Sequence, residues 1–322
     1  MSEGTFRYER PTTREAALAA LAAPGTVAIG AGTDLLVTIA EGLVAPDRVV
    51  DVRALPDARR ILVRPDGSAH LGAAVRIADL AAHPDLRARF PVLAESAASV
   101  GTPALRNMGT LAGNLAQRQH CWYLRRGVQC FKNGGTSCAA FAGEHRYHGI
   151  VADGTCRSVH PSDPAVALEA LDARVEVAGS DGTVRQLSIP ELYAGASSNR
   201  ESETTLRAGD LIVGVELPAA AARGAQHWEK LMQRGAWDFA LVSCAAVRRT
   251  DGAVRVVLGG VAAAPWRLAL SVEEDIASGG LDEESLDPLA ERAMYDVAPL
   301  AGNAYKVTLA KTLLRRAMRA IG

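Results

Sequence analysis

The stretch Thr26-Val27-Ala28-Ile29-Gly30-Ala31-Gly32-Thr33-Asp34-Leu35 carries the first decisive pattern of this 322-residue chain. Residues 26–29 form a short apolar run typical of a buried strand, and residues 35–40 have helical spacing. The small residues between them let backbone N–H groups approach an anion closely, and Thr33 can donate a hydrogen bond to a phosphate oxygen. The loop fits neither the G-x-G-x-x-G fingerprint nor the Walker loop, which needs a lysine. The alternative interpretation is an ordinary strand-to-helix turn.

Two further motifs follow along the chain. The loop Arg106-Asn107-Met108-Gly109-Thr110-Leu111-Ala112-Gly113-Asn114 offers two glycines, a hydroxyl and a side-chain amide, which suit an extended polar ligand. Its alternative is a hairpin or Asx-type turn. His160-Pro161-Ser162-Asp163 precedes a helical segment, so Ser162 or Asp163 is expected to cap that helix. A carboxylate at this point can also accept hydrogen bonds from ribityl or ribose hydroxyls.

Four of the five cysteines lie close together in the sequence, whereas Cys244 stands alone in a strand-like stretch. The four are Cys121, Cys130, Cys138 and Cys156, and they fall in an irregular segment of about residues 117–160, typical of a long functional loop. Structural zinc sites usually contain close pairs such as C-x2-C, which this segment lacks, while iron–sulfur clusters take four thiolates at more variable spacing. Unrelated buried thiols are a further alternative. One ligand could also be replaced by a histidine of this region: His120, His145, His148 or His160.

The composition is ordinary for a soluble globular protein, with 48% apolar and 22% charged residues. The net charge is −1, and the basic residues are scattered, so we expect neither nucleic acid nor an anionic membrane as a partner. The first residues contain no apolar signal core, and no later run is long enough to cross a bilayer. We therefore expect no membrane insertion and a cytoplasmic location by default, with the periplasm reached only by co-export with a partner.

Alternating helical and strand-like segments predict an α+β fold in two parts, at about residues 1–218 and 223–322. The small residues 219–224 are a candidate linker. In the second part, strands are predicted at 227–233, 240–248 and 254–259, with a hairpin turn at Asp251-Gly252, and helices at 282–295 and 303–321. The last helix has one apolar face, formed by Ala310, Leu313, Leu314, Ala317, Met318 and Ile321.

Together these motifs resemble the FAD-binding subunit of the xanthine dehydrogenase and carbon monoxide dehydrogenase superfamily, the molybdenum hydroxylases, over nearly the whole chain. The family has a first loop close to A-G-G-T-[DN], here residues 30–34. Its second loop is close to R-N-x-[AG]-T-x-G-G-N, here residues 106–114, and P-x-S-D or a near variant follows, here Pro161-Ser162-Asp163. Ala31 and Ala112 stand where the family commonly has glycine, and their methyl groups crowd a close backbone approach.

The cysteine segment narrows this resemblance to a subgroup. Most family members pass directly from the second loop to the Ser-Asp motif. The subgroup that includes 4-hydroxybenzoyl-CoA reductase and the periplasmic-type bacterial aldehyde oxidoreductases inserts a cysteine-bearing stretch that binds a [4Fe–4S] cluster. The present insertion looks closest to the aldehyde oxidoreductases. The resemblance therefore implies that Cys121, Cys130, Cys138 and Cys156 hold such a cluster.

The same resemblance implies an FAD site. The diphosphate would be held by Ala28, Ile29, Gly30, Ala31, Gly32, Thr33, Asp34 and Leu35. The flavin and its linker would be lined by Val100, Gly101, Gly109, Thr110, Gly113, Asn114 and Ala116. Ser162 and Asp163 would complete the pocket, and Leu211 and Ile212 would pack near the isoalloxazine or the adenine. Lys230 corresponds to a lysine that approaches the flavin; its alternative interpretation is a solvated lysine on a strand.

In fold and function, the resemblance implies a two-lobed FAD-binding domain of the vanillyl-alcohol oxidase and CO dehydrogenase flavoprotein type, followed by a small C-terminal sheet-and-helix domain. It implies an oxidoreductase subunit without substrate-oxidising residues of its own. A large molybdenum-cofactor subunit would oxidise the substrate, and a small subunit with two [2Fe–2S] clusters would pass electrons to this chain and on to an external acceptor. The alternatives are the FAD subunit of a 4-hydroxybenzoyl-CoA reductase-like or xanthine dehydrogenase-like complex, a stand-alone FAD oxidase, and a zinc-stabilised binding scaffold without a redox role.

Overall fold

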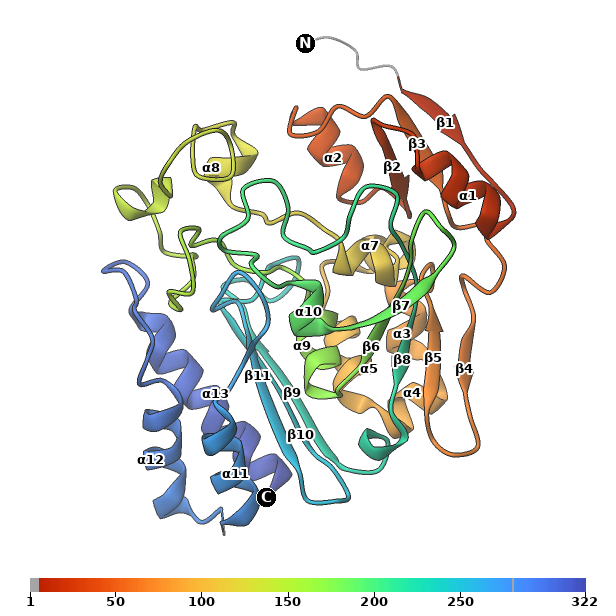
Figure 1. Ribbon diagram of the computed structural model, residues 1–322. Coiled ribbons are helices and arrows are strands. Elements are labelled where there is room, and N and C mark those ends of the chain that lie inside the picture. The colour runs from red at the N-terminus through yellow and green to blue at the C-terminus, as the bar shows by residue number, and fades with distance from the viewer. Residues whose placement is uncertain (1–5, 280) are drawn as a thin grey trace.

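The computed structural model describes residues 6–279 and 281–322 of the chain (Figure 1). The first lobe is built on a small parallel sheet. Its strand order is β1-β3-β2, and its elements are β1 (Arg7–Glu9), α1 (Arg14–Leu21), β2 (Thr26–Ile29), α2 (Leu35–Ala40) and β3 (Arg48–Asp51). The Thr13 hydroxyl accepts a hydrogen bond from the Ala16 N–H and so caps α1. The apolar side of α1 packs on Val50 and Val52, which leaves the glycine loop after β2 at the edge of this first lobe.

The second lobe is a five-stranded antiparallel sheet in the order β4-β5-β8-β6-β7. Its strands are β4 (Ile61–Val63), β5 (Ala69–Gly72), β6 (Arg174–Ala178), β7 (Val184–Ser188) and β8 (Leu211–Leu217). The helices around it are α3 (Ile77–Ala82), α4 (Pro84–Arg89), α5 (Pro91–Ala98), α6 (Pro103–Met108), α7 (Leu111–Leu115), α9 (Asp163–Ala170) and α10 (Ile189–Leu192). Leu71, Val175 and Val215 of the sheet share one buried core with Leu93 of α5 and Leu168 of α9.

The second glycine motif is helical, which corrects the prediction of an open loop there. Thr102 caps α6 by accepting from the Leu105 N–H at 3.2 Å, and Thr110 caps α7 by accepting from the Gly113 N–H at 3.3 Å. Two threonine caps eight residues apart therefore produce two short helices with a sharp bend at Gly109. The cysteine segment, in contrast, contains only α8 (Trp122–Arg125) and a single 3₁₀ turn (Ala139–Phe141), as its lack of periodicity predicted.

The C-terminal unit is a four-stranded antiparallel sheet in the order β12-β11-β10-β9, covered by three helices. After the 3₁₀ turn Ala219–Ala221, its elements are β9 (Ala225–Leu231), β10 (Val242–Arg248), β11 (Val254–Gly259), β12 (Trp266–Arg267), α11 (Leu270–Ser278), α12 (Glu283–Ala293) and α13 (Tyr305–Ile321). Along β10, Cys244 and Ala246 belong to the core between the sheet and these helices. Ala245 and Val247 point to the other face of the sheet and belong to the core of the second lobe. Both faces of the sheet are thus buried.

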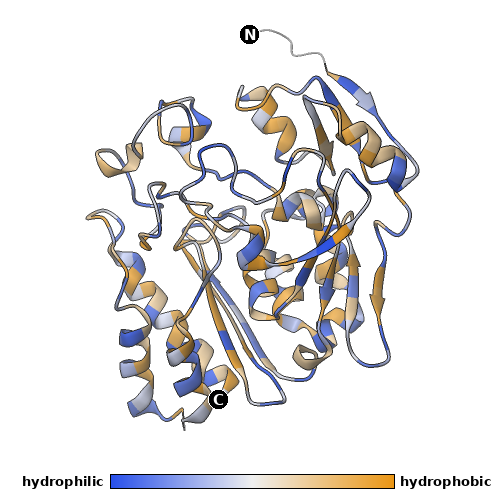
Figure 2. Ribbon diagram, viewed as in Figure 1, coloured by the Kyte–Doolittle hydropathy of each residue, from blue (hydrophilic) through white to orange (hydrophobic). Residues whose placement is uncertain are grey.

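The apolar face predicted for the last helix is confirmed, since all six of its residues are at most 1% exposed. Hydrophilic and apolar residues alternate along α11–α13, as expected for helices with one buried side (Figure 2). Within the described ranges, no helix combines the length and the apolar character needed to traverse a bilayer.

Candidate cofactor-binding site

The first glycine loop and the second motif form the walls of one cavity of about 180 Å3, here called the glycine cavity. Gly32 has φ +78°, a conformation that favours glycine, and a Cβ at Gly30 would lie 2.4 Å from the Thr110 Oγ1. Because glycine has no side chain, the loop at Gly30 and Gly32 can pack directly against the second motif. The predicted residues that line this cavity are Ala28, Gly30, Ala31, Gly32, Thr33, Asp34, Leu35, Thr110, Gly113 and Ala116.

Asp34 joins the glycine cavity to the cysteine insertion. Its carboxylate accepts hydrogen bonds from the Arg118 backbone N–H and the Arg125 guanidinium, both at 2.8 Å. Arg118 and Gln117 also line the glycine cavity, although the sequence analysis did not select them. A basic side chain four residues after the second motif was the available signal for Arg118.

A buried ion pair lies between the second lobe and the C-terminal unit. The Lys230 ammonium is 2.7 Å from the Asp163 carboxylate, and the two side chains are only 3% and 7% exposed. Lys230 also donates to the Ser99 carbonyl at 3.1 Å, next to the predicted residues Val100 and Gly101. Burial raises the pKa of Asp163, and the Lys230 charge opposes that rise. The alternative of a solvated lysine at this position is wrong.

Ser162 brings the second and third motifs together. Its hydroxyl caps α9 by accepting from the Ala165 N–H at 3.1 Å, as predicted, and it also donates to the Asn114 side-chain carbonyl. Ser162 and Asp163 line a cavity of about 220 Å3, here called the aromatic pocket, whose other side chains include His120, Cys121, Trp122, Tyr147, His148, Ser158 and Phe239. A pocket with several aromatic walls suits a planar ring system.

Leu211 and Ile212 line a third cavity, of about 340 Å3, together with Val52, Ala58 and Ala73. The Ala73 N–H donates to the Val213 carbonyl at 3.3 Å, and the Ala73 carbonyl accepts from the Ala112 N–H at 2.9 Å. This cavity is therefore joined to the second motif through the backbone of Ala73.

Three further predicted residues, Ile29, Gly109 and Val100, line none of these cavities but make contacts that fix the two glycine motifs. Ile29 is buried under the first loop, and the Gly109 carbonyl accepts from the Ile77 N–H at 2.9 Å. The Val100 carbonyl accepts from the Arg106 guanidinium at 2.8 Å. These contacts hold the two loops in shape.

The four clustered cysteines converge on one small cavity, here called the cysteine cavity, which Gln119, Phe131, Lys132 and Ser158 also line. Cys130, Cys138 and Cys156 are buried, and Cys121 is half-buried. The Cys156 thiol donates toward Cys138, which lowers the pKa of Cys138 and raises that of Cys156. Burial raises the pKa of Cys121 to about 11. Cys244 lies apart, in the core of the C-terminal unit.

No three of the four clustered thiols, which all lie in the described part of the chain, are as close together as a single zinc ion requires. A tetrahedral zinc ion with Zn–S distances of about 2.3 Å holds its sulfur atoms roughly 3.8 Å apart. In residues 6–279 and 281–322, the only three potential ligand atoms within 4.8 Å of one another belong to His70, Glu176 and Glu216 on the five-stranded sheet. There Arg64 already pairs with both oxygens of Glu216, at 2.7 and 2.9 Å. Four thiols around one cavity are the donor set that iron–sulfur clusters use, and no three of these described thiols are already arranged for a single zinc ion.

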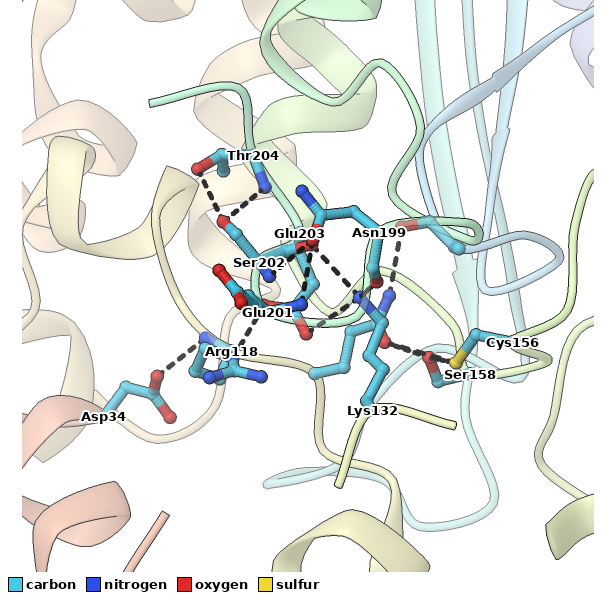
Figure 3. Close-up of polar contacts among 12 residues, drawn as sticks. Asp34, Arg118, Lys132, Cys156, Ser158, Asn199, Glu201, Ser202, Glu203 and Thr204 are labelled. Carbon is cyan, nitrogen blue, oxygen red and sulfur yellow. Dashed lines mark hydrogen bonds and ion pairs between the residues drawn. The ribbon is translucent and has the colours of Figure 1, made fainter. Parts of the chain in front are cut away.

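A buried charge network links residues of the glycine cavity to residues of the cysteine cavity; Figure 3 shows its members Arg118, Glu203 and Lys132. The Glu203 carboxylate, 3% exposed, lies 2.7 Å from the Arg118 Nε and 3.5 Å from the Lys132 ammonium. Lys132 also donates to the carbonyls of Asn199 at 2.9 Å and Ser202 at 3.1 Å. Arg118 lines the glycine cavity and Lys132 the cysteine cavity, so one carboxylate connects the walls of both.

Comparison with protein-family models gives two matches that together span almost the whole chain. Residues 4–220 match the FAD binding domain in molybdopterin dehydrogenase, and residues 228–321 match the CO dehydrogenase flavoprotein C-terminal domain. The chain belongs to the molybdopterin dehydrogenase FAD-binding family. The glycine cavity, the aromatic pocket and the cavity at Leu211 therefore lie in, or at the border of, a family FAD-binding domain.

Individual relatives support this membership. The aldehyde oxidoreductase FAD-binding subunit PaoB of Escherichia coli (strain K12) is 38% identical over 319 residues, covering 96% of each chain. The carbon monoxide dehydrogenase medium chain of Hydrogenophaga pseudoflava is 26% identical over 327 residues, covering 98% of this chain and 96% of that protein. Among solved structures, quinoline 2-oxidoreductase from Pseudomonas putida 86 has the same fold, with a TM-score of 0.76 at 24% identity over 100% of this chain and 98% of that one.

This membership confirms the predicted superfamily, the α+β fold class and the assignment to an oxidoreductase subunit rather than the substrate-oxidising one. The FAD cofactor is supported by the family match. The ligand roles of individual residues and the iron–sulfur cluster stay predictions.

Proposed function

We propose that this chain is the electron-transfer subunit of a molybdenum-dependent aldehyde oxidoreductase and that it carries both FAD and a [4Fe–4S] cluster. The observation that carries the proposal is the adjacency of the cysteine cavity and the aromatic pocket, since Cys121 and Ser158 line both. Two redox centres separated by a single wall are suited to exchange electrons. The aldehyde class is favoured because the PaoB relative is 38% identical, against 24–26% for xanthine and carbon monoxide dehydrogenase relatives.

The three cavities around the second motif fit an extended dinucleotide. The glycine cavity would hold the diphosphate through backbone N–H groups, and the cavity at Leu211 and Ile212 would hold the adenine end. The aromatic pocket would hold the flavin ring and exclude water from it. When bound, FAD supplies a centre that accepts and releases electrons singly or in pairs. The Lys230–Asp163 pair lies beside that pocket and fixes the Asp163 carboxylate, which is part of its wall.

The cysteine cavity would hold the cluster through Cys121, Cys130, Cys138 and Cys156. Thiolates are the ligands that [4Fe–4S] clusters require, and when bound such a cluster supplies a one-electron centre. Lys132 lies in the same wall and is fixed by Glu203 and two backbone carbonyls, so it provides a constant positive charge near the sulfur atoms. That charge favours the more negative, reduced form of a cluster.

The proposed partners are a large molybdenum-cofactor subunit that oxidises the aldehyde and a small subunit with two [2Fe–2S] clusters. The carbon monoxide dehydrogenase relatives are named medium chains, which is consistent with an assembly of this kind. The chain would receive electrons from the small subunit and deliver them to an external acceptor.

The test is anaerobic purification of the chain without its partners, so that the [2Fe–2S] clusters of the small subunit contribute no iron, followed by flavin and iron determination and visible spectroscopy. We expect flavin bands with a broad iron–sulfur shoulder. Cys156→Ala should lose iron but keep FAD, whereas the matched control Cys244→Ala should keep both, because Cys244 lies outside the cysteine cavity.

Each alternative class has its own outcome in this test. Zinc in place of iron, with no flavin, would establish a binding scaffold. Flavin without iron, together with aldehyde turnover by the isolated chain, would establish a stand-alone oxidase. Equal iron content in the Cys156 and Cys244 variants would remove the cysteine cavity as the cluster site.

A further inference from the structure

We propose that His148 is a positioning residue for Cys121: its Nε2–H donates a hydrogen bond to the Cys121 thiolate and raises the reduction potential of the cluster. This inference rests on the proposed cluster in the cysteine cavity. His148 lies outside the four predicted ligands, so the hydrogen bond adds a fifth residue to the surroundings of the cluster.

The contact itself is direct. The His148 Nε2 lies 3.3 Å from the Cys121 Sγ, and the histidine side chain is buried. A metal-bound thiolate has no proton to donate and acts only as an acceptor. Nε2 must therefore carry the hydrogen when Cys121 is a ligand. The other ring nitrogen, Nδ1, is buried without a hydrogen-bond partner, which agrees with a tautomer in which Nδ1 is unprotonated.

The ring is held in place by two aromatic neighbours and by hydrogen bonds to its backbone. Trp122 packs against it edge-on, with ring centroids 5.4 Å apart and an interplanar angle of 73°, and Tyr123 packs at 5.8 Å. The His148 carbonyl accepts hydrogen bonds from the Asn303 side-chain amide and the Lys306 ammonium, both at 3.1 Å. Lys306 is on α13, so the C-terminal helix fixes the backbone from which the ring projects.

The position of Cys121 gives this hydrogen bond its effect. Cys121 lines both the cysteine cavity and the aromatic pocket, whereas Cys130, Cys138 and Cys156 line only the first. Uptake of one electron by a cluster increases the negative charge on its thiolates, so a donor to Sγ stabilises the reduced form more than the oxidised form. No proton is transferred in this step. Removal of the donor should therefore lower the reduction potential.

The experiment is an EPR-monitored redox titration of the holo-complex carrying His148→Leu. We expect at least a tenfold decrease in the ratio of reduced to oxidised cluster at a given potential, which corresponds to ~59 mV for a one-electron couple. His148→Gln keeps a side-chain N–H donor and should restore most of the shift. Tyr295→Phe is the matched control, because Tyr295 is 83% exposed and lies outside the walls of both the cysteine cavity and the aromatic pocket. Its potential should equal that of the wild type.

The outcomes separate this inference from the proposed function. A wild-type complex without a [4Fe–4S] EPR signal would overturn both. A wild-type signal with equal iron content and equal potential in His148→Leu would overturn the hydrogen bond alone. If His148→Leu loses iron, His148→Gln decides: a potential near the wild-type value supports the proposal, and loss of iron there too would assign His148 a purely structural role and overturn it.

Discussion

Replacement of Glu203 by glutamine tests the buried charge network between the two proposed cofactor sites (Figure 3). The substitution removes a negative charge that faces both Arg118 and Lys132. Removing one partner of a buried ion pair typically costs 3–5 kcal/mol. Lys132 keeps two carbonyl acceptors, and the Arg118 side chain is 21% exposed and so partly hydrated. These compensations lower the expected loss to about 2–3 kcal/mol.

The assay is thermal and urea unfolding of the purified chain, with Glu201→Gln as the matched control. Glu201 lies two residues away and is exposed, and surface substitutions usually change stability by less than ~0.5 kcal/mol. For a unit of this size, about 2–4 °C in Tm accompanies each kcal/mol, so Glu203→Gln should lower the Tm by ~5–10 °C. Limited proteolysis should also cut the cysteine insertion faster in this variant, because Lys132 lies within it.

Two results would refute this reasoning. One is a stability difference of less than ~0.5 kcal/mol between the Glu203 and Glu201 variants, which would mean that water or other acceptors replace the carboxylate completely. The other is strict additivity of Glu203→Gln with Lys132→Met. Directly interacting residues should instead show a coupling of roughly 0.5–3 kcal/mol in a double-mutant cycle.

Three further substitutions test other features. Lys230→Met leaves the buried Asp163 carboxylate unpaired and should cost about 3–5 kcal/mol. Burial raises the pKa of Asp163 and the Lys230 charge opposes that rise, so the folded variant binds more protons than the folded wild type; urea unfolding should show a larger penalty at pH 8 than at pH 5, and equal penalties would contradict this. Gly42→Ala, with φ +73° and no atom within 4 Å of the new Cβ, should cost about 1–2 kcal/mol and leave FAD unaffected in a fluorescence assay. Gly32→Ala should cost more and weaken FAD retention, because its φ is also positive and its Cβ would lie 2.8 Å from the Leu36 side chain. Burial lowers the pKa of Lys306 to about 7, so between pH 7 and 10 the unfolded chain binds more protons than the folded chain. Urea titrations should therefore show the wild type gaining stability relative to Lys306→Met as the pH rises through that window. A constant stability difference would argue against this reasoning.

Local patterns predicted much of this fold. The strands Thr26–Ile29 and Val254–Gly259 and the helix Leu35–Ala40 have the predicted bounds, because apolar runs and turn residues mark both of their ends. The second motif was predicted as an open loop because its glycines outweighed the capping signals at Thr102 and Thr110, which determine the two helices. Such caps are short-range and could have been recognised from the sequence.

Other features depend on contacts that no local pattern contains. The face of α13 was predicted from Ala310 to Ile321, yet Lys306 on the same helix is also buried, where it donates to the carbonyls of Tyr147, His148 and Gly260. A lysine at such a position is ordinarily predicted to be solvated. The Glu203 network was missed for the same reason, since its partners are far apart in the sequence and only the folded chain brings them together.

The carboxylate of Asp34 has a consequence for how the protein matures. It is part of the glycine loop, but its two hydrogen-bond donors, Arg118 and Arg125, belong to the segment that leads into the cysteines. We therefore expect the glycine loop to reach its final shape only when this neighbouring segment is ordered. Metal loading and flavin loading are therefore expected to be interdependent during biogenesis, and a chain made under iron starvation should also release its flavin more readily.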